Sequence, residues 1–253
     1  MNKKIINKYF VVNKDNFLTG LIGKGKQKTR LTIPKSVKEI GSYVFWNYKS
    51  LKNIFIPNSV IKIGNGTFTG CEKLKNITIP KSVKEIGNNA FKDCKKLEKI
   101  TFAEESQLEK IGDSAFENCT NLTNIIIPNS VTKIGYSVFY NCINLQTINI
   151  PESVTEIGGY VFMNCKKLTS DSVINNSPVL FGWWVWNHQY NGQTMSQMDE
   201  IDLSQFTNST GKNFNVISPH TFSECRKLNK IIIPKSVTTI GNWAFIENTK
   251  NKK

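Results

Sequence analysis

Long apolar runs are absent from this sequence of 253 residues. No segment approaches the ~20 consecutive apolar residues that a bilayer-spanning helix requires. Near the start, Asn7 and Lys8 interrupt the apolar residues between Ile5 and Val12, so that stretch is too short and too broken for a secretory signal. We therefore predict no transmembrane segment, and either a cytoplasmic location or an export signal that this sequence does not include.

Histidine is also scarce, and His188 and His220 are the only two in the chain. The sequence has no phosphate-binding glycine loop, no dinucleotide-binding glycine pattern and no metalloprotease helix. A pair of Cys225 with a histidine is the one nucleophilic arrangement that the residues offer. Because Cys225 has a fixed place in a repeat, we favour a structural role for it, and we predict no catalytic residue, no metal site and no cofactor.

Acidic residues are too few to balance the basic ones, and the formal net charge is +14. The excess lies at the two ends of the chain. Residues 1–30 have eight Lys or Arg and one acid, and residues 226–253 have seven and one. The 195 residues between them carry 18 bases and 17 acids. Basic ends can attract polyanions, but basic and aromatic residues are not interleaved on any one face.

What the sequence does contain is an internal repeat of 23 residues. The phrase Ile-x-Ile-Pro-x-Ser-Val-x-x-Ile-Gly-x-x-x-Phe-x-x-Cys-x-x-Leu recurs along the chain, and one unit has two extra residues between Ala103 and Lys110. Its phenylalanine stands at Phe45, Phe68, Phe91, Phe116, Phe139, Phe162, Phe222 and Phe245. One unit alone buries too little apolar surface to offset the conformational entropy of its ordering. Stacked units share burial and pair their strands, so we predict a solenoid with a parallel sheet.

The first half of each unit has the pattern of a strand followed by a turn. Ile54 and Ile56 alternate with Asn53 and Phe55, which is the period of a strand with one buried face. Pro57 cannot donate to a sheet, so we expect the strand to end there. Ser59 follows this proline, and its short hydroxyl can bond backbone groups of the turn. Its equivalents are Ser36, Ser82, Ser130, Ser153 and Ser236.

The second half of the unit predicts a return path. Val60 and Ile63 indicate a second short extended piece that faces inward. Gly64 allows a left-handed turn. Phe68 and Cys71 are three residues apart, which predicts one helical turn on the convex side.

All the cysteines occupy one position of the repeat, three residues after the phenylalanine. They are Cys71, Cys94, Cys119, Cys142, Cys165 and Cys225. An even number permits disulfides, but equivalent positions on adjacent coils favour a single file of small buried apolar side chains. Tyr48 and Asn248 take this position in the first and last units, so a thiol is not required there.

The repeat resembles the BspA-type leucine-rich repeat, also called the Treponema pallidum type. The resemblance covers roughly residues 9–168 and 198–248, and includes an opening segment from Asn16 to Pro34. It implies a curved solenoid with a parallel sheet on the concave side. It also implies a cell-surface or secreted protein that functions in adhesion and protein binding, and it carries over no catalytic site.

We accordingly divide the chain into four parts. Residues 1–30 are a basic N-terminal cap, and residues 31–168 are leucine-rich repeats. Residues 169–213 are an aromatic insertion with one degenerate repeat strand at Ile201 to Ser204. Residues 214–253 are C-terminal repeats and a basic tail, whose last unit is either the edge of a longer repeat array or an end open to self-association.

Two rows of outward residues on the predicted sheet form the candidate binding surface. The first row contains Asn53, Asn76, Lys99, Asn124 and Thr147. The second row contains Phe55, Thr78, Thr101, Ile126 and Asn149. Phe55 and Ile126 are apolar where water is expected, and an exposed apolar cluster marks a binding site. The alternative is a solvated polar face without a ligand.

The insertion offers a second candidate surface. It contains Trp183, Trp184, Trp186 and Tyr190, and Trp and Tyr dominate the binding energy of many interfaces. The alternative is that these rings pack on the flank of the solenoid and seal an irregular turn. We expect a non-catalytic scaffold that binds another protein or an extracellular-matrix component. The alternative function is polyanion binding, to a glycan, a nucleic acid or an anionic membrane, through the basic termini, although we do not expect nucleic acid as a partner.

Overall fold

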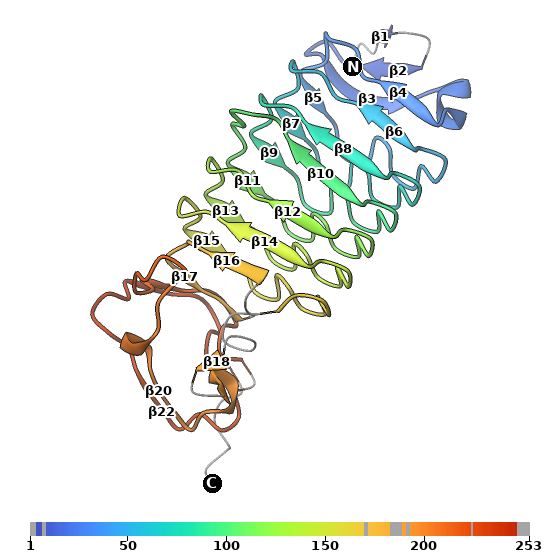
Figure 1. Cartoon of the computed structure of the whole chain (residues 1–253). Coiled ribbons are helices and arrows are strands. Elements are labelled where there is room, and N and C mark those ends of the chain that lie inside the picture. The colour runs from blue at the N-terminus through green and yellow to red at the C-terminus, as the bar shows by residue number, and fades with distance from the viewer. Residues whose placement is uncertain are drawn as a thin grey trace.

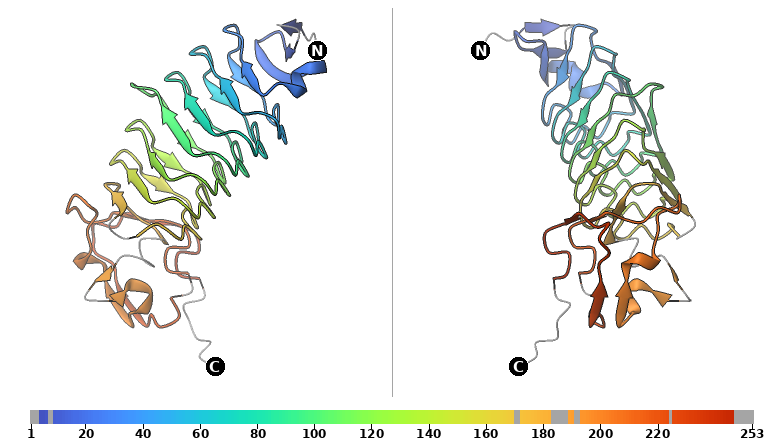
Figure 2. Two further views of the ribbon diagram at one scale, coloured as in Figure 1. Left: turned by 45° about the vertical axis from the view of Figure 1, so that its right-hand side comes forward. Right: turned by 90° about the vertical axis from the view of Figure 1, so that its left-hand side faces the viewer.

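The computed structural model describes residues 4–6, 9–169, 172–182, 189–190, 193–223 and 225–246. Figure 1 shows them as coils that stack side by side, from the blue N-terminal coils to the red C-terminal ones, and Figure 2 shows that the stack bends. The architecture is a solenoid with parallel sheets, which confirms the solenoid and the parallel pairing that the repeat predicts. Among the described residues, no helix has both the length and the apolar character that crossing a bilayer demands.

The first extended segment of each coil forms the longer strands. They are β4 (Arg30–Thr32), β6 (Asn53–Phe55), β8 (Asn76–Ile79), β10 (Lys99–Phe102), β12 (Asn124–Ile126), β14 (Thr147–Ile150) and β16 (Val173–Asn175). Strands β4 and β6 are paired, as are β8 and β10, while β12, β14 and β16 form a three-stranded sheet. All these pairs are parallel and join equivalent residues, such as Asn53 with Arg30. Ile54 and Ile56 point inward and are buried, as their spacing predicts.

The second extended segment forms a longer ladder of two-residue strands. They are β5 (Glu39–Ile40), β7 (Lys62–Ile63), β9 (Glu85–Ile86), β11 (Lys110–Ile111), β13 (Lys133–Ile134) and β15 (Glu156–Ile157). The isoleucine of each strand is buried and packs on its equivalent in the next coil. At the N-terminal end β1 (Lys4–Ile6), β2 (Phe10–Val12) and β3 (Phe17–Leu21) continue this sheet, and the β1–β2 and β2–β3 pairs are antiparallel.

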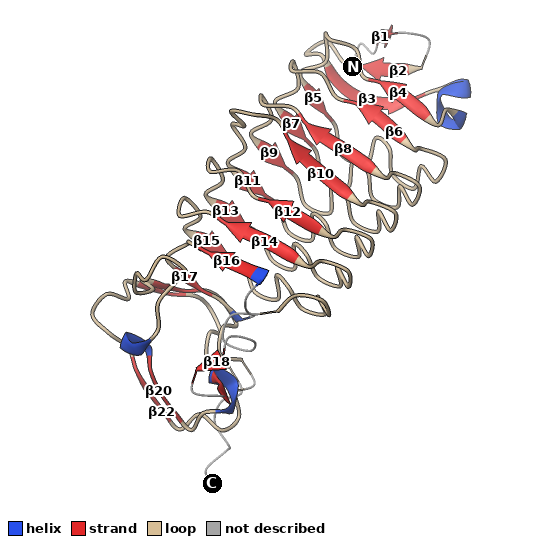
Figure 3. Ribbon diagram, viewed as in Figure 1, coloured by secondary structure: helices blue, strands red, loops and turns tan. Residues whose placement is uncertain are grey.

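The predicted helical turn after each glycine is wrong. Figure 3 shows the repeat turns as loops, and the helices that the structure describes in full are the short 3-10 segments η1 (Gly23–Gln27), η3 (Met195–Gln197) and η4 (Leu203–Gln205). Asn89 and Asp93 have φ of 57° and 60°, which a right-handed helix does not allow. The amides of Asn89, Phe91 and Asp93 donate to the next coil, to the carbonyls of residues 113, 115 and 117. Bonds between coils thus replace the bonds along a helix.

The left-handed backbone that Gly64 allows is not present at this residue. The glycine that follows each short strand, such as Gly64, has no positive φ. The left-handed residue of this turn lies two positions later, at Gly66, with φ of 58°. A Cβ on Gly64 would lie 2.7 Å from the carbonyl carbon of Gly41 and from the amide nitrogen of Ser42. Close approach of two neighbouring backbones, and not handedness, therefore requires glycine here.

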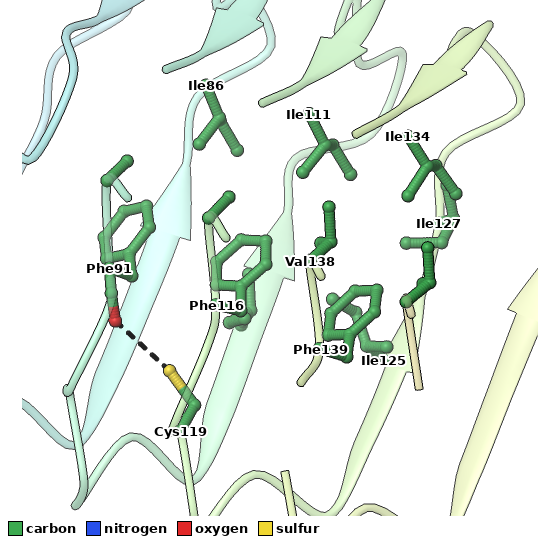
Figure 4. Close-up of a cluster of buried hydrophobic side chains, with 14 of the residues drawn as sticks. Ile86, Phe91, Ile111, Phe116, Cys119, Ile125, Ile127, Ile134, Val138 and Phe139 are labelled. Atoms are coloured by element: carbon green, nitrogen blue, oxygen red, sulfur yellow. Dashed lines mark hydrogen bonds between the residues drawn. The ribbon is translucent and has the colours of Figure 1, made fainter. Parts of the chain in front are cut away.

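Equivalent side chains form columns along the molecule, as the repeat predicts. The rings of Phe45, Phe68, Phe91, Phe116, Phe139 and Phe162 are stacked, with neighbouring centroids 5.1–5.6 Å apart. Figure 4 shows Phe91, Phe116 and Phe139 in one row, with Ile86, Ile111 and Ile134 in another. All these side chains are almost completely buried. The columns make one continuous core that no single coil could provide.

The cysteine column confirms the structural interpretation of the thiols. All six cysteines are free and buried. Each of the first five donates a hydrogen bond to a carbonyl of the preceding coil, as Cys119 Sγ does to Phe91 at 3.3 Å (Figure 4). Tyr48 has the same place in the first unit, and its hydroxyl donates to the carbonyls of Gly25 and Lys28. A side chain that reaches back to a carbonyl is the common requirement at this position.

The serine column also links coils. Ser82, Ser130, Ser153 and Ser177 donate to carbonyls of the preceding coil at 2.6–2.8 Å. The acceptors of these bonds belong to the neighbouring coil and not to the turn itself, whereas the buried Oγ of Ser59 has no hydrogen-bond partner among the described residues. Each coil is therefore fixed to the next by strand pairing, by turn amides and by side-chain donors.

The coils after Leu168 depart from the regular pattern. A three-stranded parallel sheet contains β17 (Val179–Leu180), β21 (Val216–Ile217) and β23 (Thr239–Ile240). A separate parallel pair contains β20 (Glu200–Asp202) and β22 (Lys230–Ile232), so the degenerate strand expected near Ile201 is present. An antiparallel hairpin, β18 (Gln189–Tyr190) and β19 (Gln193–Thr194), precedes them.

Asn208 anchors the loop between β20 and β21. Its side-chain amide donates to the carbonyls of Asn176 and Ser177 at 3.0 and 3.2 Å. Its Oδ1 accepts from the backbone amides of Thr210 and Lys212, both at 3.0 Å. Asn208 is 5% exposed, so these bonds satisfy polar groups that water does not reach. A polar network thus holds the irregular loop against the preceding coil.

Candidate interaction surface

The outward side chains of β4, β6, β8, β10, β12, β14 and β16 form one surface, which we call the strand face. Alternation along each strand positions them, because every second residue must point away from the core. The predicted residues on it are exposed, except that Asn149 is half-buried. In-register pairing places each row in a line, since Asn124 pairs with Thr147 and Ile126 with Asn149.

Strand β16 adds a residue to this surface that the sequence analysis did not include. Ile174 lies directly beside Asn149 and is 51% exposed. The signal was present in the alternation of Val173, Ile174 and Asn175, but this segment lacks the proline and serine spacing of the other units. The second row therefore continues past residue 168.

Two hollows lie on the strand face. One of about 820 Å³ is lined by Thr32, Phe55 and Thr78 among others. The other, of about 490 Å³, is lined by Thr101 and Ile126 among others. Ala103 borders both hollows, and it belongs to the turn with two extra residues. The lengthened turn thus borders both hollows of a surface that is otherwise regular.

Asn149 has an unusual environment on this face. Its Oδ1 is buried and has no hydrogen-bond partner among the described residues. Ile126 and Ile174 flank it on the two neighbouring strands, and Ile126 is 72% exposed. A buried acceptor without a donor costs about 1–3 kcal/mol. Two exposed apolar side chains around an unpaired acceptor fit a ligand that brings both an apolar group and an N–H or O–H donor.

The aromatic residues of the insertion are largely outside the description of the structure. Trp183, Trp184 and Trp186 lie outside the described residues. The backbone of Tyr190 forms β18 and pairs with Gln193, but its side chain is not described. The aromatic segment as a contact surface stays a prediction.

Two of the residues considered for catalysis, Cys225 and His220, are packed against other parts of the solenoid. Cys225 is fully buried, and desolvation raises the pKa of its thiol to about 12, so a thiolate is strongly disfavoured. His220 packs between Tyr160 and Trp243, with ring centroids 4.9 and 5.4 Å away, and its Nδ1 lies 3.2 Å from Tyr160 Oη. His188 lies outside the described residues. The sequence did not indicate this aromatic contact, because Tyr160 and His220 are separated by the interruption.

Metal ligands do not converge in the part of the chain that the structure describes. No group of three or more His, Cys, Asp and Glu side chains is placed to hold an ion there. The exposed ion pairs, such as Lys62 with Glu85 at 2.8 Å, join neighbouring coils instead.

Stacked coils with these columns define a parallel β-solenoid of leucine-rich repeats. The chain belongs to the BspA-type leucine-rich repeat family, because the model "BspA type Leucine rich repeat region (6 copies)" matches residues 24–112, 105–180 and 192–253. Members of this family are scaffolds built from the repeat. No curated protein matches the sequence.

Solved structures agree with this assignment. The Treponema pallidum leucine-rich repeat protein has a TM-score of 0.63 and 26% identity, with 73% of this chain and 88% of that chain covered. A leucine-rich repeat protein from Bacteroides ovatus has a TM-score of 0.58 and 30% identity, with 89% and 60% covered. A leucine-rich cell surface protein from Faecalibacterium prausnitzii has a TM-score of 0.58 and 27% identity, with 97% and 74% covered.

Proposed function

We propose that the chain is a non-catalytic scaffold for protein binding and adhesion, which takes its ligand on the strand face at the cell surface or outside the cell. The ligand is another protein or a component of the extracellular matrix. The observation that carries the proposal is the group formed by Ile126, Asn149 and Ile174, in which an unpaired buried acceptor lies between two exposed apolar side chains.

Rigidity of the strand face supports this function. Strand β14, which carries Asn149, is held by parallel pairing on both sides, so little backbone entropy is lost there when a ligand binds. Apolar residues at the centre with polar residues around them are the usual composition of protein interfaces. Phe55, 59% exposed beside the larger hollow, supplies a second apolar contact about three coils away.

The location outside the cell rests on the relatives. The Faecalibacterium prausnitzii protein is described as a cell surface protein, and the family resemblance implies the same for this chain. Buried thiols are compatible with either an oxidising or a reducing compartment, since none is placed in a disulfide.

A test uses an array of immobilised extracellular-matrix proteins and the full chain, at moderate and at high salt. Ile126→Asp should lower the affinity for a bound matrix protein by about tenfold or more, because burial of one such side chain contributes about 1.5–3 kcal/mol. Ile61→Asp is the matched control, since Ile61 is also exposed but lies outside the strand face.

Two results would contradict the proposal. Equal binding by wild type, Phe55→Asp and Ile126→Asp would show that the strand face is not the contact surface. A steep fall of affinity with salt, together with retention on immobilised heparin, would instead support polyanion binding through the basic ends.

A further inference from the structure

The larger hollow of the strand face differs from the smaller one in its charge. Arg30 and Lys35 are among the described residues that line it, and no Asp or Glu is. The smaller hollow is lined by one base, Lys99, and one acid, Glu105. The larger hollow therefore has an excess of positive charge, whereas the charges of the smaller one balance.

No acid of the described chain neutralises the two bases. Neither Arg30 nor Lys35 belongs to any of the ion pairs that join described residues. Lys81 is equivalent to Lys35 and lies two coils further along, and it pairs with Glu105 at 3.1 Å. Because Arg30 and Lys35 are both exposed, a negative group from another molecule can reach them.

Phe55 gives the same hollow an apolar wall. Its side chain is 59% exposed, and its backbone pairs in register with Thr32 on β4. Thr78 has the equivalent position on β8 and also lines the hollow. An exposed ring beside two unpaired bases is complementary to a ligand that is both apolar and negative.

The hollow lies within the stack and at an interruption of the sheet. Strand β4 pairs with β6, and β8 pairs with β10, but β6 and β8 belong to separate sheets although they are neighbours (Figure 1). The lining residues run across this interruption, from β4 to β8. Strand β3 precedes these coils and β10 follows them, so the hollow does not depend on where the chain begins or ends.

Ser59 adds a hydrogen-bond donor that is not used inside the chain. It is among the residues that line the hollow, and its Oγ is buried without a hydrogen-bond partner among the described residues. The equivalent hydroxyl of Ser82 donates to the carbonyl of Val60 at 2.7 Å. A serine hydroxyl can rotate toward an acceptor, and a carboxylate is a stronger acceptor than a neutral oxygen.

We propose that this hollow binds an acidic segment of the partner protein, in which the carboxylate of Glu or Asp lies next to an apolar side chain. The carboxylate pairs with Arg30 and Lys35, and the apolar side chain packs on Phe55. The inference rests on the proposed function, because it names the chemistry of the ligand that the strand face takes. A protein segment fits better than a polyanion, since a polyanion binds a row of bases and only two line this hollow.

Selection of peptides tests the proposal. A phage-displayed library of short random linear peptides is selected on the immobilised full chain, after depletion on the double variant Arg30→Glu/Lys35→Glu. We expect the enriched peptides to share Glu or Asp next to an apolar residue. One enriched peptide is then labelled and titrated with the full chain by fluorescence anisotropy, beside a copy in which Gln or Asn replaces its acids.

The double variant should bind the labelled peptide about tenfold more weakly, and Phe55→Ala should also weaken it about tenfold, as loss of a central contact does. Lys99→Glu is the matched control for charge, because Lys99 is exposed on the strand face but does not line this hollow. It should bind as wild type does, since three coils at about 4.8 Å each exceed the Debye length of about 8 Å. The copy without acids should bind about tenfold more weakly than the acidic peptide.

The two serines separate binding from folding. Ser59→Ala should bind the peptide about threefold more weakly with an unchanged unfolding temperature, because its hydroxyl has no partner inside the chain. Ser82→Ala should lower the unfolding temperature and bind as wild type does, because its hydroxyl joins two coils. The double variant should unfold at the wild-type temperature, since neither base has an ion pair to lose.

Three results would overturn the proposal: no enriched peptide, enriched peptides without acids, or equal binding of the peptide by wild type and the double variant. Displacement of the peptide by a heparin oligosaccharide, whose own binding is lost in the double variant, would also overturn it, because a polyanion would then occupy the hollow. Ile126→Asp distinguishes this inference from the proposed function. A matrix protein whose binding is weakened by Ile126→Asp but not by the double variant would contradict the inference alone.

Discussion

Replacement of Gly112 by alanine should destabilise the fold strongly, although the new side chain is a single methyl group. A Cβ at this position would lie 2.5 Å from Asn88 Oδ1, 2.6 Å from Asn88 N and 2.7 Å from the carbonyl carbon of Gly87. Ordinary contacts of a Cβ begin near 3.4 Å, so the two coils must separate by about 0.8 Å.

That separation has a calculable cost. The Gly112 amide donates to Ile86 at 2.8 Å, and the Asp113 amide donates to Asn88 Oδ1 at 2.9 Å. Both bonds would lengthen to roughly 3.6 Å and would be lost, at about 1 kcal/mol each. Strain from an overpacked site adds about 1–3 kcal/mol. The free energy of unfolding should therefore fall by about 3–5 kcal/mol.

Urea unfolding followed by circular dichroism measures this change. Gly20→Ala is the control, because its Cβ would meet nothing within 4 Å, and it should stay within about 0.5 kcal/mol of wild type. Gly112→Asn separates close approach from handedness, since asparagine tolerates a left-handed backbone but not a backbone contact. The reasoning is refuted if Gly112→Ala matches wild type or if Gly112→Asn is tolerated.

Two further predictions concern the loop anchor and the thiols. Asn208→Ala should lower stability by about 2–3 kcal/mol, because it leaves buried carbonyls and amides unpaired; thermal unfolding checks this, and equal loss in the exposed control Asn215→Ala would contradict it. Burial raises the pKa of the Cys165 thiol from 9.0 to about 12. As the pH rises above 9, this thiol therefore ionises in the unfolded chain before it ionises in the folded one. The free energy of unfolding should then fall by about 1.4 kcal/mol per pH unit for each such thiol. Cys165→Ala should show a shallower fall in urea midpoint between pH 9 and 12, and an unchanged slope would count against this explanation.

The sequence predicted the regular part of the fold because the repeat leaves one arrangement that buries its apolar residues. Equivalents of Ile54, Phe68 and Cys71 recur through most units, and only stacking in register brings them into columns. The path of the turns could not be predicted in the same way. Phe68 and Cys71 are three apart in a helix and also in successive turns, so their spacing does not distinguish the two.

The candidate site was predictable only in part. Alternation identified Phe55 and Ile126 as outward residues, because strand geometry fixes which side chains leave the core. The unpaired acceptor of Asn149 depends on how neighbouring atoms bury its side chain, which no spacing shows. The contact of Tyr160 with His220 depends on how the coils after the interruption dock, and the repeat pattern contains no sign of that.

The columns make the length of this molecule adjustable. A coil meets only the coil before it and the coil after it, and both neighbours offer the same surfaces. Removal of one whole unit, such as residues 72–94, would bring Phe68 beside Phe116 in the spacing that Phe91 now provides. A gene for such a protein can gain or lose 23 codons at a time and still encode coils whose contact surfaces fit one another. The span over which a ligand is contacted can change in this way without a new core.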